Sequence, residues 1–503
     1  MTVGSTTATI EAVFRIEFPR LVASLARRVD DVSLAEDLAQ EALADAMVVW
    51  SRDGVPRNPG AWLMTVGKRK AIDRFRRDRT LAAKYRQLAP LARDADVDAE
   101  IDAVLDGDDI EDDRLRMMFV ACHPVLPIAA RTALTLRLVG GLSTAEIGRA
   151  YLQAERTVAQ RIVRAKKAIA AAGVPFEVPE GEERARRLGS VLEVIYVIFN
   201  EGYTATAGPQ WTRPDLCHEA LRLGRQLARL SPDESEVHGL VALMELQSSR
   251  LAARVGPSGE IVLLADQDRR RWDQLHVRLG LAALARAEEL RPELGPYAIQ
   301  AAIAACHSRA SSVEATDWPQ VVGLYERLAA GTPPSPIVEL NRAVAVSMAS
   351  GPADALKLVD DIVSSGSLDR YHLLHSVRGD LLAKLGRHDE AAVAFEHAAT
   401  LATNDAERSF SASRARVSAA LAAAPVLTDG RVTLRVLALA DAAAWLAGED
   451  DEQLHRFQLP AANLADVERA IRRWQAGWSE GGLHQWGVWV GGALAGGVEL
   501  RVR

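Results

Sequence analysis

The sequence predicts a mainly all-α protein that ends in a small α+β segment. Ala, Leu, Arg and Val dominate the 503 residues and long β-branched alternations are scarce, a composition that favours helices. Apolar residues recur at helical spacing through residues 10–78, 111–172 and 184–292. Residues 431–503 differ, because they read as strand, helix, helix, strand and strand. The length suits about three domains.

Charge is distributed in blocks that the net charge of −7 conceals. Residues 52–86 hold eleven Lys or Arg against three acids, residues 94–113 hold eleven acids and no base, and residues 114–173 hold ten bases against two acids. This order fits two DNA-facing modules joined by an acidic linker over residues 79–110. Taken alone, ordinary solvated helix faces explain the blocks about equally well.

The segment from Val32 to Trp50 predicts an amphipathic helix with an acidic exposed face. Its expected apolar stripe consists of Leu34, Leu38, Ala42 and Met47. The expected acidic side consists of Asp37, Gln40, Glu41 and Asp45. Such a face repels phosphates but can dock a basic protein surface, although on charge alone a merely solvated face is the stronger reading.

The segment from Asn58 to Arg79 predicts a basic helix that begins at Asn58-Pro59-Gly60. Three apolar side chains are expected to pack inward: Trp62, Val66 and Ile72. Four basic side chains are expected outside: Lys68, Arg69, Arg76 and Arg77. A helix of this kind can follow a phosphate backbone, and the polar loop at residues 51–58 before it could hold an unstacked base.

The segment from Leu142 to Ile169 predicts a helix-turn-helix. Ser143 and Glu146 have the spacing of a capping box at the start of its first helix. The residues expected to bury the interface are Ile147, Ala150, Val158, Ile162 and Val163. Solvent-facing candidates on the second helix are Thr157, Gln160, Arg161, Arg164 and Lys167. Gln160 and Arg161 suit base edges, whereas Arg164, Lys166 and Lys167 suit phosphates.

Residues 293–424 carry a repeat of 34 to 36 residues. Each copy has a small or β-branched residue, a larger one four positions on, and a small or aliphatic one seven on. The copies are Val321/Tyr325/Leu328, Ala355/Val359/Ile362 and Ala391/Phe395/Ala398. The last copy, together with Gly379 and Gly386, has the spacing of a tetratricopeptide (TPR) repeat, in which small residues let two helices approach. A generic helical bundle is the weaker alternative.

Three cysteines in so long a chain do not form a disulfide framework, which fits the reducing cytoplasm. The first residues lack the pattern of a signal peptide, and no run reaches about 18 consecutive apolar residues, so no membrane span is expected. Each cysteine precedes a histidine, at Cys122, Cys217 and Cys306, but adjacent residues chelate one ion poorly. The sequence therefore predicts no metal, no cofactor and no catalytic site.

Three segments together resemble the extracytoplasmic-function (ECF) group of bacterial RNA polymerase sigma factors. They are AEDLAQEAL at residues 35–43, NPGAWLMTVGKRKAIDRFRR at residues 58–77, and LRLVGGLSTAEIGRA with TVAQRIVRAKKAI within residues 136–169. Their order matches region 2, linker and region 4. IYVIFNEGY at residues 195–203 and LLADQDRRRWD at residues 263–273 look like the subgroup with a C-terminal TPR-type extension.

The resemblance implies an alternative sigma factor whose partners are core RNA polymerase and promoter DNA, with no membrane partner. It implies a region 2 helical bundle at 10–78, a region 4 helix-turn-helix at 111–172, a helical domain at 184–292 and TPR-like repeats at 293–424. Implied polymerase contacts are Asp37, Leu38, Gln40 and Glu41. Implied contacts to the −10 element are Asn58, Trp62, Lys68, Arg69, Asp73, Arg76 and Arg77. Implied contacts to the −35 element are Arg156, Thr157, Gln160, Arg161, Arg164 and Lys167.

The sequence departs from the family's pattern at two places. The turn Leu152-Gln153-Ala154 lacks the usual glycine, and Ala121 stands where a second cysteine is expected beside Cys122. Residues 431–503 resemble the opening half of a GNAT-type acetyltransferase without its later glycine-rich loop, so no acetyl transfer is expected. The sequence leaves open whether residues 431–503 are a vestige, a partner-binding patch or half of a split gene.

Two other function classes remain open at this level. One is a DNA-binding regulator or TPR scaffold without sigma activity, for which duplex binding in the absence of polymerase is the mark. The other is an acetyltransferase with a DNA-binding front half, for which acetyl-CoA binding is the mark. In the sigma-factor reading, the TPR-like extension regulates the factor, with a regulatory protein as its possible partner.

Overall fold

The computed structural model describes residues 3–86, 110–331, 335–448, 463–481 and 483–501. It is mainly helical with one four-stranded sheet near the C-terminal end, which confirms the predicted fold class. The chain forms two compact units. The first contains residues 1–204, 212–245 and 285–292, and the second contains the remainder.

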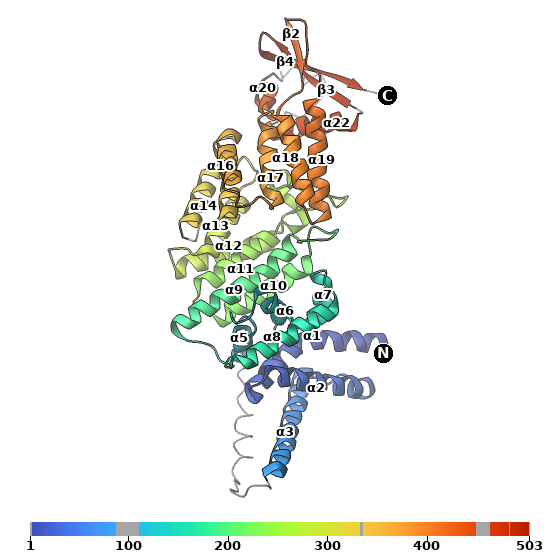
Figure 1. Ribbon diagram of the computed structural model, residues 1–503, viewed down its shortest axis with the longest axis vertical. Coiled ribbons are helices and arrows are strands. Elements are labelled where there is room, and N and C mark those ends of the chain that lie inside the picture. Colours follow the sequence, from blue (N-terminus) through green and yellow to red (C-terminus); the bar gives the residue numbers. More distant parts are fainter. Residues whose placement is uncertain (1–2, 87–109, 332–334, 449–462, 482, 502–503) are drawn as a thin grey trace. The chain divides into compact units, whose positions relative to one another are not determined.

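The first bundle consists of α1 (Val3–Val29), α2 (Val32–Asp53) and α3 (Pro59–Arg86), drawn in blue in Figure 1. Phe18, Leu21 and Leu25 of α1 are fully buried in its core. Helix α2 begins where the Asp31 side chain accepts hydrogen bonds from the next backbone amides. The sequence predicted a linker over residues 79–110, but residues 79–86 continue α3, so the prediction was wrong there. The rest of that predicted linker falls almost wholly outside the described residues.

One residue of the predicted apolar stripe of α2, Met47, is exposed. Met47 is 58% exposed, and Val48 beside it is 73% exposed. The buried residues of α2 are Ala35, Glu36, Leu38, Ala39, Ala42, Leu43, Ala46 and Trp50. Positions 39, 42, 46 and 50 recur every three or four residues on one side of a helix, and position 47 lies about 100° around the helix from position 46. The prediction for Met47 was therefore wrong.

The second bundle consists of α5 (Ile110–Ala121), α6 (Ile128–Leu138), α7 (Thr144–Ala150) and α8 (Glu155–Ala171). The capping box of Ser143 and Glu146 is present at the start of α7, as predicted. The turn between α7 and α8 places Leu152 in the left-handed region, with φ of 50°. A glycine usually occupies that conformation, so the missing glycine leaves local strain in place of a different turn.

The buried side of α8 consists of Val158, Ile162, Ala165 and Ile169. These positions are separated by four, three and four residues, the spacing of a single helix face. Val163 was predicted to be buried but is 48% exposed, because it lies about 100° around the helix from Ile162.

The next helices are α9 (Gly181–Tyr203), α10 (Pro214–Leu230), α11 (Ser235–Ser248) and α12 (Gln274–Leu290). Helix α9 packs against α5, α6 and α10, and α10 also contacts α5. Residues of α11 and α12 belong partly to each unit. Short 3-10 turns lie between them, within residues 251–271.

Helices α13 to α19 are successive and pack against their neighbours in the chain. They are α13 (Pro296–Arg309), α14 (Trp318–Gly331), α15 (Pro336–Ala349), α16 (Pro352–Ser365), α17 (His372–Lys384), α18 (His388–Leu401) and α19 (Asp405–Ala422). The three repeat copies fall on α14, α16 and α18, and all but Tyr325 among their marker residues are buried. A Cβ built on Gly379 meets the Phe395 ring at 3.0 Å, so this glycine lets α17 approach α18.

The C-terminal segment has the predicted order of strand, helix, helix, strand and strand, with one further short strand before it. It comprises β1 (Leu427–Thr428), β2 (Val432–Arg435), α20 (Ala442–Ala447), α22 (Leu464–Glu480), β3 (Leu483–Val490) and β4 (Ala493–Arg501). The strands pair antiparallel in the order β1-β2-β3-β4. Leu437, Ala442, Val467 and Ile471 form the small core between the sheet and its helices.

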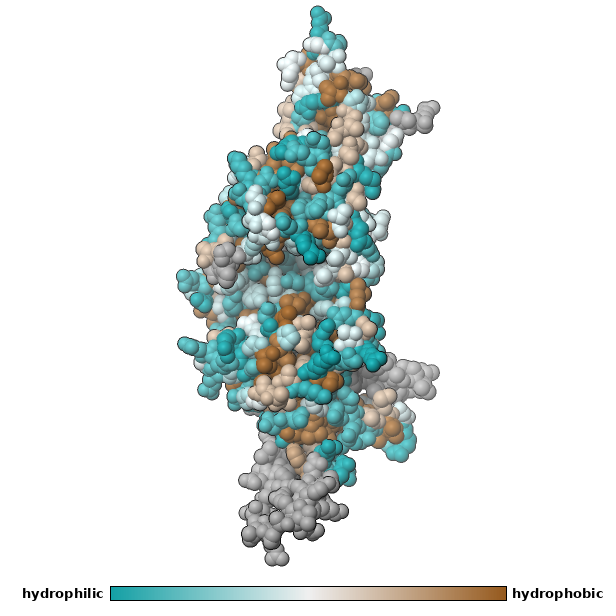
Figure 2. All heavy atoms as spheres, in the orientation of Figure 1, coloured by the Kyte–Doolittle hydropathy of each residue, from teal (hydrophilic) through white to brown (hydrophobic). Residues whose placement is uncertain are grey.

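On the face drawn in Figure 2, hydrophobic residues lie in small groups among hydrophilic ones. Within the described residues, no helix combines the length and the apolar character that crossing a membrane requires. The same residues contain no group of three or more His, Cys, Asp or Glu placed to hold a metal ion.

Candidate polymerase and nucleic-acid interface

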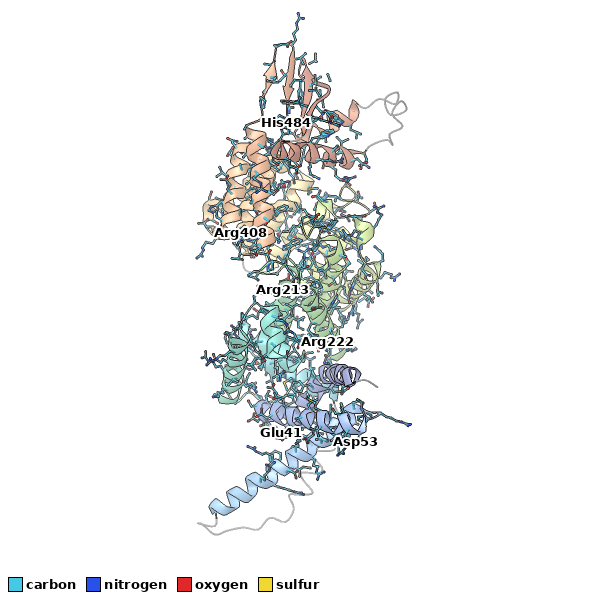
Figure 3. The ribbon with its side chains drawn as sticks, turned by 90° about the vertical axis from the view of Figure 1, so that its right-hand side faces the viewer. Glu41, Asp53, Arg213, Arg222, Arg408 and His484 are labelled. Atoms are coloured by element: carbon cyan, nitrogen blue, oxygen red, sulfur yellow. The ribbon has the colours of Figure 1, made fainter. Side chains whose placement is uncertain are left out.

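The exposed face of α2 carries the predicted acidic residues. Asp37, Gln40 and Glu41 are exposed, and Glu41 is labelled in Figure 3. Leu38 is only 3% exposed and belongs to the core, so the expectation that it contacts a partner surface does not hold in this structure. Lys70 of α3 reaches the same face, with Nζ 3.0 Å from Asp45 and 3.5 Å from Glu41.

Lys70 limits how negative this face is. The hydrogen bond to Asp45, with a smaller contribution from the charge of Glu41, raises the pKa of Lys70 above its ordinary value. The ammonium therefore stays charged and neutralises part of the acidic cluster. The acids left to attract a basic partner are those farther from Lys70, Asp37 above all.

The predicted −10 residues all lie on α3 or at its start. The Asn58 side chain accepts a hydrogen bond from the Ala61 amide at 3.1 Å and so caps the helix. Trp62 is half-buried, with its ring 5.3 Å from that of Trp50. Lys68 is half-buried as well. The exposed members of the set are Arg69, Asp73, Arg76 and Arg77.

The predicted −35 residues all lie on α8, outside its buried stripe. Five of the six are exposed: Arg156, Thr157, Gln160, Arg164 and Lys167. The sixth, Arg161, is half-buried and donates from Nη1 to the Gln153 side chain at 2.8 Å. A helix with one apolar side against its bundle and a basic, polar outer side has the form of a helix that enters a major groove.

Sequence reasoning missed Glu36, which joins the two bundles. Glu36 is 3% exposed. Its Oε1 accepts from Arg137 Nε of α6 at 2.7 Å, and its Oε2 accepts from Lys166 Nζ of α8 at 2.9 Å. Burial raises the pKa of the carboxyl, but the charges and hydrogen bonds of Arg137 and Lys166 outweigh burial, so the net pKa lies below its ordinary value.

The sequence does contain a pattern that marks Glu36 as a buried charge. Position 36 falls at helical spacing from Ala39 and Leu43, inside the arc that α2 buries. A charge on such an arc requires a buried partner of opposite sign. The partners themselves are 101 and 130 residues away, so nothing local identifies them.

Further contacts hold the two bundles together. Asp113 of α5 is 1% exposed and lies 3.2 Å from Arg27 Nε of α1. The Arg137 guanidinium also lies 5.0 Å from the centre of the Phe18 ring. The two predicted DNA-facing helices are therefore parts of one compact unit in this structure.

Three family models match this chain. Sigma-70 region 2 matches residues 14–80, and sigma-70 region 4 matches residues 116–169. A family of unknown function, DUF6596, matches residues 187–288. The first two matches coincide with the first and second bundles, and the third covers α10, α11 and most of α9 and α12.

Two relatives were found. An uncharacterized protein from Rhizobium meliloti (strain 1021), R00370, is 46% identical over 395 residues, which are 78% of this chain and 92% of that protein. The ECF RNA polymerase sigma factor SigK from Mycobacterium ulcerans (strain Agy99) is 28% identical over 147 residues, which are 28% of this chain and 74% of that protein. The chain therefore belongs to the same family as the Rhizobium meliloti protein, and its first third carries the region 2 and region 4 domains of sigma-70 factors.

Proposed function

We propose that this protein is an alternative sigma factor of the ECF group, which binds core RNA polymerase and directs it to a promoter. The observation that carries the proposal is the pairing of sigma-70 region 2 with sigma-70 region 4 in one chain, in that order. The likeness to the ECF sigma factor of Mycobacterium ulcerans supports it. A sigma factor works where its polymerase and DNA are, so the proposed location is the cytoplasm.

Core polymerase is proposed to bind the exposed acidic face of α2. Asp37, Gln40 and Glu41 present carboxylate and amide groups to solvent there, beside the exposed apolar side chains of Met47 and Val48. An acidic face with apolar neighbours suits a basic protein surface, because charge guides the encounter and apolar burial adds affinity.

The −10 element is proposed to bind along α3. Arg69, Arg76 and Arg77 are exposed on this helix and can contact successive phosphates. Trp62 near its start offers an aromatic surface to an unstacked base, and Asn58 lies one turn earlier. Lys68 and Asp73 complete the proposed set.

The −35 element is proposed to bind α8 in its major groove. Gln160 and Arg161 have side chains that match base edges, and Arg156, Arg164 and Lys167 are exposed cations that suit phosphates. Arg161 must exchange the Gln153 side chain for a base to do so. Thr157 lies one turn before Arg161 on the same outer face.

The helices after region 4 are proposed to regulate the factor, with the TPR-like pairs as the docking place for a regulatory protein. Ile337, Val344 and Met348 of α15 are 45%, 40% and 37% exposed. Their spacing of seven and four residues puts them on one side of the helix, which supports a surface that a partner helix can cover.

Run-off transcription with purified core polymerase tests this function. The full chain should give a transcript from a cognate promoter, and scrambling either promoter element should abolish it. Stable binding to duplex DNA without any binding to core polymerase would instead identify a DNA-binding regulator. Acetyl-CoA binding in calorimetry would point to an enzyme.

Charge reversal on α2 sharpens the test. Asp37→Lys with Glu41→Lys should weaken core binding by about tenfold or more, because like charges then face each other across the interface. Asp53→Lys is the matched control, since Asp53 is an exposed acid on the same helix three turns from Glu41 (Figure 3). Equal core affinity for all three proteins would contradict the proposed contact.

A further inference from the structure

Carbonyls at the ends of three helices of region 4 accept hydrogen bonds from side chains of later helices. Helices α5, α6 and α7 each leave their last backbone carbonyls without partners inside the helix. These ends also carry the negative pole of the helix dipole, so a cation placed there is stabilising. The donors that meet these carbonyls come from α9 and from the start and body of α10, which the family of unknown function covers.

Side chains of α9 donate hydrogen bonds to carbonyls at the end of α5. Arg187 is 4% exposed, and its Nη2 donates to the Phe119 carbonyl at 3.1 Å. Ser190, one turn later, donates from Oγ to the Cys122 carbonyl at 2.5 Å. Arg131 of α6 donates in turn to Ser190 and to Glu193, at 2.5 and 2.8 Å. Helix α9 is therefore joined to both α5 and α6 by polar contacts, which are buried or half-buried except for the one to the exposed Glu193.

Arginines at the start and in the body of α10 donate hydrogen bonds to carbonyls at the ends of α6 and α7. Arg222 Nη2 donates to the Val139 carbonyl at 3.2 Å, and Glu219 holds the same guanidinium at 2.6 Å. Arg213, the residue before α10, donates to the Ala150 carbonyl at the end of α7 and to Glu201 Oε1 of α9 at 2.6 Å. Both arginines are labelled in Figure 3.

Arg213 contacts the end of α7, just before the turn that leads into α8. Ala150 is the last residue of α7, and the strained Leu152 follows two positions later. The turn is tight, because a Cβ on Gly148 would lie 2.7 Å from the Gln153 carbonyl. Helix α8 starts at Glu155, so a shift of the α7 end moves the start of the recognition helix directly.

We propose that α9 and α10 complete the −35-binding module, and that Arg213 is a positioning residue which sets the turn before α8. This inference rests on the proposed function, and it gives the first helices of the family of unknown function a role. Arg213 touches no DNA in this role. It acts through the Ala150 carbonyl, while Glu201 fixes the guanidinium from the other side.

The test uses the full chain with Arg213→Met, Arg213→Lys and the control Arg229→Met, which removes an exposed arginine from α10. With core polymerase, Arg213→Met should reduce the preference for an intact over a scrambled −35 element by about tenfold, a change of 1.4 kcal/mol. Core affinity should not change. Arg213→Lys should recover most of the preference, because an ammonium can still bond a carbonyl and a carboxylate.

Hydrogen exchange provides the second readout and does not depend on polymerase. Arg213→Met should speed amide exchange over residues 151–160 and leave α1 to α3 unchanged, whereas Arg229→Met should change neither. Unaltered exchange and an unaltered −35 preference in folded Arg213→Met overturn the inference. If Arg213→Met does not fold, Arg222→Met takes its place with the same two readouts, and wild-type behaviour of folded Arg222→Met overturns the inference. If the wild-type chain itself gives no transcript with core polymerase, that result rejects the proposed sigma function but not the positioning role of Arg213.

Discussion

Replacing Glu36 with glutamine tests how firmly regions 2 and 4 are held together. Glutamine has the same size and keeps one oxygen, which can still accept from Arg137. Its amide group, however, then faces the ammonium of Lys166, and the buried negative charge is gone. Arg137 and Lys166 have side chains that are only 12% and 13% exposed, so water compensates them poorly.

The magnitude follows from these two ion pairs. A hydrogen bond to a charged group contributes about 1.5–3 kcal/mol, and breaking a buried pair on one side costs about 3–5 kcal/mol. We take about 3 kcal/mol for the weakening of the contact between the regions. That value shifts the equilibrium between the closed arrangement and an open one by about 150-fold.

Opening matters because of promoter geometry. The −35 and −10 elements are about 25 base pairs apart, or about 85 Å at about 3.4 Å per base pair. In the proposed function α3 and α8 bind these two elements, whereas here Lys166 Nζ of α8 lies 2.9 Å from Glu36 of α2, so binding both elements at once requires this contact to open. Glu36→Gln should therefore raise the apparent affinity for a two-element promoter in the presence of core polymerase.

The direct assay is energy transfer between dyes at two exposed positions, Thr65→Cys on α3 and Ala170→Cys on α8. The three native cysteines are buried. Glu36→Gln should lower the transfer efficiency, and the control Lys167→Met, which changes the exposed neighbour of Lys166, should not. Equal efficiency in all three proteins would refute the reasoning.

The pH dependence of the same signal has a definite sign. The pKa of Glu36 in the folded chain lies below its ordinary value of 4.5. The contribution of the ion pairs is thus fully present above about pH 4.5 and is lost as the pH falls through the lower folded-state pKa. Between about pH 6 and pH 8 the wild-type efficiency should stay constant.

Three further predictions concern stability. Leu152→Gly should stabilise the chain by about 0.5–1 kcal/mol in urea unfolding, because it relieves a left-handed residue, and Leu152→Ala should not. Gly379→Ala should cost about 1–3 kcal/mol by crowding Phe395, whereas Gly323→Ala, which meets nothing within 4 Å, should be neutral or stabilising. Burial and two nearby arginines lower the pKa of His307 to about 3, so melting temperature should fall as the pH drops below about 6.5, and His307→Gln should reduce that fall.

Local patterns in the sequence were enough to predict most of the helices and strands. The capping box at Ser143 and the outer face of α8 depend only on neighbours within a few turns, and both were predicted. Met47 and Val163 were misplaced because each lies one residue from a buried position, where an apolar side chain gives no warning that it points outward. Periodicity identifies a buried face less securely than it identifies a helix.

The contacts between segments could not be predicted in the same way. The bonds of Arg187, Arg213 and Arg222 to region 4 join residues 63 to 83 positions apart. An arginine that caps a distant carbonyl looks in the sequence like any arginine on a helix surface. Glu36 alone gave a usable sign, since its charge sits among buried positions of α2.

The capping of region 4 by later helices has a consequence for how the protein is made. Helix α8 ends at Ala171 and α10 ends at Leu230, so roughly 60 residues separate the end of α8 from the end of the last helix that contacts region 4 in this way. At about 5–20 residues per second, a ribosome needs roughly 3–12 seconds to add them. During that interval Arg187, Arg213 and Arg222 are added one after another, so the set of contacts that they make to region 4 is complete only after translation passes Arg222.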